Sequence, residues 1–168
     1  DNIKGPLFLR VLLLNCLSRE YIDFWKSNWN DEYLEDEWSI IDKRLPIIKS
    51  LDSDWKLETM SLNYFARRIA GIEIDVIVAL ALNFNLEELL IMYNVQFPVL
   101  QQNEDDTWFD QEGNIVFTCS KGLNGVGVDR SIWETIRDMQ EGETYEHTLE
   151  KSELYYGYKL TYHAPFEK

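Results

Sequence analysis

The sequence is poor in the residues that build metal and redox centres. Its 168 residues include two histidines and two cysteines. Neither Cys-x-x-Cys nor His-x-x-x-His spacing occurs, so the sequence predicts no metal site. Cys16 and Cys119 lie far apart, each within an apolar run, which does not make a disulfide framework. We expect both thiols to be free and buried in a reducing compartment, the cytoplasm.

Long apolar segments and flexible linkers are also missing. The run LFLRVLLLNCL at residues 7–17 is shorter than the ~20 residues that a membrane span needs, and it contains Arg10 and Asn15. We therefore expect a buried helix there and no membrane contact. Four prolines and eight glycines leave no room for a long linker. The chain begins at Asp1 without methionine, and we expect a single domain over residues 1–168 that is a fragment of a larger protein.

Basic residues are few compared with acidic ones. Lys and Arg number 16 against 30 Asp and Glu, which gives a net charge of −14. A protein that grips nucleic acid over its whole surface has a basic face, so any DNA contact must be local. Acidic clusters at 31–37, 104–106 and 141–153 predict a well-solvated surface. A second interpretation is that this surface binds a basic partner.

The apolar spacing predicts helices in the first part of the chain. One helix is expected from Pro6 to about residue 27, because Pro suits the first helical turn. A second is expected over 62–83, and a third over about 86–94 with Pro98 preventing its extension.

Side chains that favour helix starts precede these segments. Ser61 or Thr59 can cap the second helix and Asn85 the third. Ser131 and Glu134 form the S-x-x-E capping-box pattern before a further short helix.

The last part of the chain shows strand patterns instead. TWFDQEGNIVFTCS, residues 107–120, predicts a hairpin that turns at 110–114. Two further strands are expected in TYEHTLE and LYYGYKLTYHAPF, joined near Lys151 and Ser152. Helices followed by strands predict an α+β fold. In it, a helical part of about residues 1–98 packs with a small antiparallel sheet of hairpins in about residues 99–168.

The loop SKGLNGVGVDR, residues 120–130, resembles a phosphate-binding loop in composition but not in spacing. Its lysine precedes the glycines, unlike a Walker loop, and the glycine spacing is the reverse of the dinucleotide-binding pattern. A tight turn that feeds the next helix explains it most simply. Its amides and basic side chains could also contact a DNA backbone. The candidate contacts are Lys121, Gly122, Asn124, Gly125, Gly127 and Arg130.

Glu73 is the most unusual single charge, because it falls on the apolar stripe of the second helix. A buried carboxylate must be paired or neutralised. We expect a buried ion pair with an arginine, with Arg68 as the candidate, and a catalytic or metal-binding acid is the alternative. No second acid that would converge on Glu73 can be named, so the chain itself is expected to have no catalytic residue.

Several longer strings carry a family resemblance. FLRVLLLNCLSREYIDFW, ARRIAGIEIDVIVALAL, YNVQFPVLQQNEDDTWFDQEGNIVFTCSKGLNGVG and TYHAPF occur in this order. Together they resemble the C-terminal region of very large bacterial proteins of the class I adenine-specific DNA methyltransferase family, which are fused restriction–modification enzymes.

The resemblance implies a non-catalytic C-terminal accessory domain in phage defence. Such a domain would help to position DNA or dock onto other domains of the parent protein. The alternative is an acidic protein-interaction module with no direct DNA contact. The parent protein would use S-adenosylmethionine, whereas no cofactor is expected in this chain. Its expected partners are the other domains of the parent and, through the glycine loop, DNA.

Overall fold

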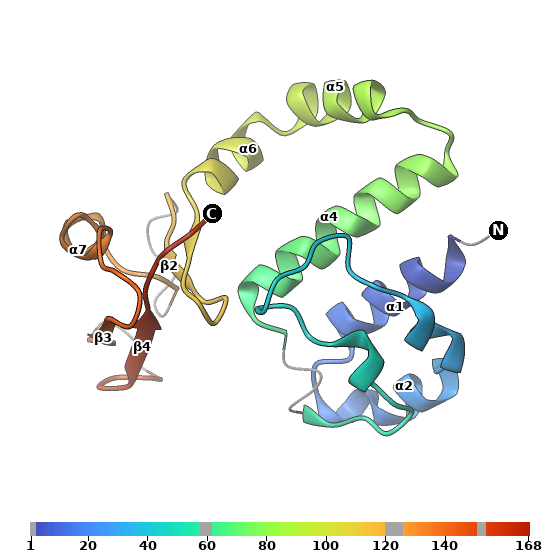
Figure 1. Cartoon of the computed structure of the whole chain (residues 1–168), viewed down its shortest axis with the longest axis horizontal. Helices are drawn as coiled ribbons and strands as arrows, with labels where there is room; N and C mark the ends of the chain where they lie inside the picture. The colour runs from blue at the N-terminus through green and yellow to red at the C-terminus, as the bar shows by residue number, and fades with distance from the viewer. Residues whose placement is uncertain (1–2, 58–61, 120–125, 151–153) are drawn as a thin grey trace. The chain divides into compact units, whose positions relative to one another are not determined.

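The computed structural model describes residues 3–57, 62–119, 126–150 and 154–168 (Figure 1). The chain divides into two compact units, Asp1–Ile91 and Met92–Lys168, and the boundary falls within helix α5 (Leu86–Gln96). Six α-helices and two antiparallel two-stranded sheets in the described ranges confirm the predicted α+β class. Each unit has a hydrophobic core of its own.

The first unit is helical and is built on the packing of α1 against α4, which Figure 1 shows. Besides the first half of α5, the described part of this unit contains the helices α1 (Lys4–Asn15), α2 (Ile22–Asn28) and α4 (Tyr64–Ala81). Its 3₁₀ turns are η1 (Arg19–Tyr21), η2 (Asp31–Glu35) and η3 (Ile48–Ser50). α1 also contacts η2, η2 contacts η3, and η1 contacts α2.

The single helix predicted from Pro6 to residue 27 is wrong, because the segment forms two helices. The backbone leaves the helical region at Cys16 (φ −82°, ψ 52°) and at Ser18 (φ −141°, ψ 164°). This break allows Trp25 of α2 to enter the same core cluster as Leu13 of α1 with no exposed surface. In a continuous helix, Trp25 would lie about 18 Å from Leu13 along the axis, because it comes twelve residues later and each residue adds about 1.5 Å.

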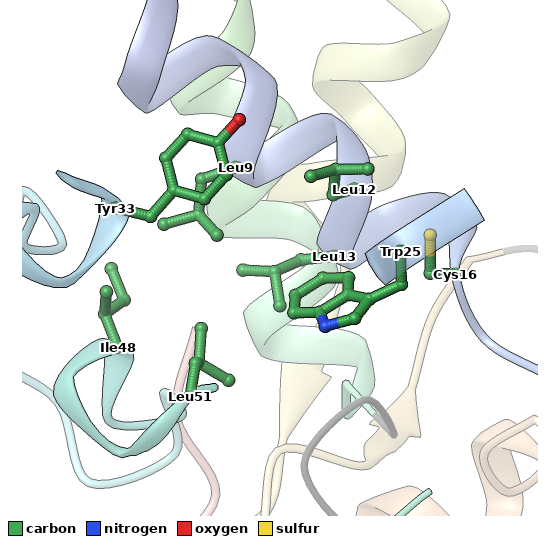
Figure 2. Packing of buried hydrophobic residues seen from close by; sticks show 8 residues of the cluster. All are labelled: Leu9, Leu12, Leu13, Cys16, Trp25, Tyr33, Ile48 and Leu51. Carbon is green, nitrogen blue, oxygen red and sulfur yellow. The ribbon is translucent and has the colours of Figure 1, made fainter. Parts of the chain in front are cut away.

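The core of the first unit gathers side chains from α1, α2, η2 and η3, which converge in Figure 2. Its buried members are Leu9, Leu12, Leu13, Cys16, Trp25, Tyr33, Ile48 and Leu51. The N–H group of a buried indole needs a hydrogen-bond acceptor. Trp25 Nε1 donates to the carbonyl of Asp52 at 3.0 Å, and Trp55 Nε1 donates to the carbonyl of Cys16 at 2.6 Å.

The helix starts agree with the sequence in one case and differ in two. Asn85 and Glu88 form a reciprocal capping box before α5, which confirms Asn85 as its cap. The cap of α4 is Asn63, whose Oδ1 accepts from the Ala66 N–H at 2.7 Å. The predicted caps Ser61 and Thr59 lie outside the described residues. The box expected from Ser131 is wrong, because α7 begins at Arg130 and Ser131 already lies in its first turn.

The second unit combines short helices with two hairpins. Its elements are α6 (Pro98–Asp105), β1 (Trp108–Phe109), β2 (Ile115–Phe117), α7 (Arg130–Ile136), β3 (Thr144–Thr148) and β4 (Lys159–His163). β1 pairs with β2 and β3 with β4, both antiparallel. The hairpin predicted to turn at 110–114 is therefore confirmed. Pro98 does end α5, but it also begins α6, which the sequence patterns did not predict.

Trp133 of α7 is the centre of the second core. Its ring stacks on Phe117 of β2, with centroids 5.3 Å apart and planes inclined by 7°. Trp108 and Phe166 pack beside the same indole at centroid distances of 5.4 and 5.8 Å. This aromatic cluster joins α7, the β1–β2 hairpin and the end of the chain, so these four aromatic side chains serve packing. Tyr155, Tyr156 and Tyr158 are instead exposed.

Candidate functional site

Glu73 of α4 is buried, with 6% of its surface exposed, and both of its oxygens are occupied. Arg10 Nε of α1 donates to Oε2 at 2.6 Å. The backbone N–H of Ser39 donates to Oε1, also at 2.6 Å. Charge-assisted hydrogen bonds of this kind compensate for the loss of solvent around a carboxylate.

Arg10 is itself enclosed by acceptors, with 3% of its surface exposed. Its guanidinium forms an ion pair with Asp36 and donates to the carbonyl of Glu37 at 2.8 Å and to that of Pro6 at 3.2 Å. It also lies over the ring of Trp38 at 5.3 Å. The cluster therefore links α1, α4 and the segment that follows η2 through one side chain.

The protonation state of Glu73 follows from these contacts. Burial alone would raise its pKa, but the hydrogen bonds from Ser39 and the Arg10 guanidinium outweigh burial and lower the pKa below its ordinary value. The lowered pKa favours the ionised carboxylate, and each of its oxygens already accepts a hydrogen bond within the core. A general acid or base must reach the proton it transfers, so this geometry favours the structural ion pair over the catalytic alternative.

The arginine that pairs with Glu73 differs from the expected one. Arg68 lies on the same helix five residues earlier, which is about 140° away around the axis at 3.6 residues per turn. The two side chains therefore point in different directions. Arg10 reaches Glu73 because α1 packs against α4. Only the tertiary packing brings residues so far apart in the sequence together.

Asp110 is a second buried carboxylate, and it was missed as an individual site by sequence reasoning. It is fully buried at the start of the β1–β2 turn. Its Oδ1 accepts from the N–H groups of Glu112 at 3.0 Å and Asn114 at 2.8 Å, and its Oδ2 accepts from the N–H of His163 at 3.3 Å. Asp in a turn was the available signal, but the contact with β4 was not predictable locally. Asp110 holds the hairpin to β4 and is structural.

The glycine loop is described only in part. Lys121, Gly122, Asn124 and Gly125 lie outside the described residues. Arg130 is exposed at the start of α7, with its guanidinium over the ring of Phe117 at 5.2 Å. It therefore keeps a positive charge at the surface next to the loop.

Gly127 has a conformational role. Its φ is +72°, and a Cβ built on it would lie 2.8 Å from the carbonyl oxygen of Val116. The same oxygen accepts from the N–H of Val128 at 2.7 Å. A glycine is needed here because the chain returns along β2 at a distance that no side chain allows.

An exposed apolar helix is the feature that the sequence patterns did not reveal as functional. None of the large side chains of α5 is fully buried. The signal that could have found it is a gap in the charges: between Arg68 and Lys121 the sequence contains no Lys, Arg or His, and every charged residue is acidic. α5 lies in the middle of this cation-free region, defined here as residues 69–120.

Other kinds of site receive no support from the described residues. Within those ranges, no three His, Cys, Asp or Glu side chains come together as ligands for a metal ion. None of the helices in the same ranges combines the length and the apolar character that crossing a membrane requires. No family model matches the chain, and no curated protein or solved structure matches it significantly.

Proposed function

We propose that this chain is a non-catalytic accessory domain that docks onto other domains of a bacterial restriction–modification protein. The docking role is carried by the exposure of α5, in which Ile91 and Val95, on one face of the helix, are 54% and 68% exposed. Exposed contiguous apolar surface on a folded protein is typical of an interaction site. The restriction–modification setting is supported by the resemblance of the longer sequence strings alone. That setting implies a cytoplasmic protein, with S-adenosylmethionine as the cofactor of the catalytic domain elsewhere.

The non-catalytic part of the proposal is supported by the Arg10–Glu73 pair. The carboxylate that stood out in the sequence is paired with Arg10 within the core rather than held in an open cleft. The second buried acid, Asp110, accepts hydrogen bonds from backbone N–H groups of its own unit. Neither acid has the access to solvent or substrate that proton transfer requires.

A second candidate function is a local contact with the DNA backbone near Arg130. It is favoured by the exposed guanidinium of Arg130 next to the loop that contains Lys121. The net charge of −14 opposes it over the rest of the surface.

Two measurements separate these functions. The docking proposal predicts that the chain co-purifies with the methyltransferase domain encoded by the same gene when the two are co-expressed as separate polypeptides. A gene without such a domain, or a domain that does not bind, would contradict it. The DNA candidate predicts binding to a 30-base-pair duplex that strengthens as salt is lowered to about 50 mM and weakens in Arg130→Gln. Absence of binding at that salt concentration rules the DNA contact out.

A further inference from the structure

Helix α5 is apolar around most of its circumference. Leu86 and Leu90 lie four residues apart on one face, while Ile91 and Val95 lie four apart on another, with Met92 beside them. All five are exposed, by 41% to 70% of their surface. A helix with apolar side chains on all faces is normally buried within a larger structure. These five residues, which we call the exposed surface of α5, are therefore exposed although a helix of this composition is normally buried.

Carboxylates border this surface at the start of the helix. Glu87 precedes Ile91 by four residues and Glu88 precedes Met92 by four, so both acids continue the rows of apolar side chains. Glu88 is held in place by its hydrogen bond from the Asn85 N–H at 2.9 Å. No cation within the sequence from 69 to 120 offsets these charges. The only charges within α5 are therefore the two carboxylates at its start, beside the apolar side chains.

The carboxylates beside the exposed surface of α5 limit the kinds of molecule that can bind to it. A second copy of the chain would bring the same acidic border, and another net charge of −14, against the first. An anionic lipid surface or DNA would meet the same repulsion. A polypeptide with apolar anchors and Lys or Arg around them is complementary in both respects. Since α5 is a helix of 11 residues, a second helix of about three turns matches it in length and form.

We propose that the exposed surface of α5 binds a basic amphipathic helix contributed by another domain of the same protein. The helix would place Leu- or Ile-type side chains against Ile91 and Val95, with Lys or Arg side chains opposite Glu87 and Glu88. This inference rests on the proposed docking role and specifies which surface performs it and which chemistry the partner has.

The test uses the whole 168-residue chain and a fluorescein-labelled 18-residue model peptide. The peptide has leucines at helical spacing and lysines elsewhere, and a matched peptide replaces every lysine with glutamate. Fluorescence anisotropy should give tighter binding of the lysine peptide. The double substitution Ile91→Ser/Val95→Ser should weaken it about tenfold, as expected for loss of central apolar anchors. Glu87→Gln should weaken it less and reduce its salt dependence.

A matched control is Ile41→Ser. Ile41 is a fully exposed apolar residue of the first unit. It lies outside the cation-free region, shortly before Lys43 and Arg44. The substitution should therefore leave the affinity for the lysine peptide unchanged. Circular dichroism should be the same for all variants, because none of the altered side chains is buried.

Three results with the peptides and the chain alone would overturn the assignment. They are equal binding of the two peptides, an affinity that the double substitution does not change, and a dimer in sedimentation velocity that the double substitution dissociates. The last would identify a second copy as the occupant. If the domain from the same gene binds wild type and double variant equally, docking holds and the α5 assignment fails. If it binds neither, the docking proposal itself fails.

Discussion

Arg10 and Glu73 are 63 positions apart in the sequence, yet Nε of Arg10 lies 2.6 Å from Oε2 of Glu73 in the interior of the first unit. The pair ties α1 to α4, and the second oxygen of Glu73 ties both helices to the backbone of Ser39. A charge that looked like a candidate catalytic acid is thus a structural connection between helices.

Removing Arg10 should strongly destabilise the first unit. Arg10→Met leaves Glu73 buried without its cation, and breaking a buried pair in this way typically costs about 3–5 kcal/mol. Urea denaturation followed by circular dichroism measures the loss. The double substitution Arg10→Met/Glu73→Met should cost less than the sum of the single ones, because Glu73 is then no longer a buried carboxylate without its cation. The matched control is Lys159→Met, since the exposed Lys159–Glu146 pair should leave the midpoint unchanged.

The stability of the first unit should fall in acid because of Glu73. Its pKa in the folded state is lowered below the ordinary value of 4.5: burial opposes this shift, and the hydrogen bonds from Ser39 and Arg10 exceed that effect. A group with a lowered folded-state pKa stabilises the protein fully above its unfolded-state pKa, and the contribution is lost as the pH falls through the folded-state value. Urea midpoints of wild type should therefore decrease below pH 4.5.

Glu73→Gln provides the comparison for this pH dependence. The variant is less stable than wild type at pH 7, but it cannot lose a carboxylate contribution, so the two proteins should approach each other as the pH is lowered. Asp42, whose pKa is lowered chiefly by its hydrogen bond from Arg44, contributes equally in both. A difference between wild type and Glu73→Gln that stays constant from pH 7 into the acid range would contradict the prediction.

Gly127 should tolerate alanine less well than Gly142. Both have positive φ values, +72° and +88°, which cost an alanine about 1–2 kcal/mol. At Gly142 the added Cβ meets no atom within 4 Å, whereas at Gly127 it would lie 2.8 Å from the carbonyl oxygen of Val116. Thermal or urea unfolding should show the larger loss for Gly127→Ala. Equal losses would mean that the strand β2 can move aside.

Asp110 should be replaceable by asparagine more easily than by alanine. Asp110→Ala removes the acceptor of the N–H groups of Glu112, Asn114 and His163, and each buried group left without a partner costs about 1–3 kcal/mol. Asp110→Asn retains one side-chain oxygen that can accept from Glu112 and Asn114. We expect the free energy of unfolding to decrease from wild type to Asp110→Asn and further to Asp110→Ala. If Asp110→Ala were more stable than Asp110→Asn, the hydrogen bonds to the Asp110 carboxylate would not be what stabilises the turn.

Much of the secondary structure was predictable because its signals are local. The capping box of Asn85 and Glu88 and the hairpin turn at 110–114 depend on neighbours within a few residues, and both are present. The first helix was predicted too long, since its apolar pattern continues through Ser18 although the backbone is extended there. Trp25 gains its burial from that break, and the gain arises from contacts with distant residues.

The sequence by itself determined the α+β class, the positions of most helices and strands, and a cation-free acidic region around α5. Periodicity and turn chemistry act over a few residues, and charge is a matter of composition, so all three can be deduced without coordinates. The tertiary structure alone decided that Glu73 pairs with Arg10, that Asp110 reaches β4, and that α5 remains exposed. An apolar pattern shows that a helix has a face to bury, but which surface covers it depends on how distant segments pack.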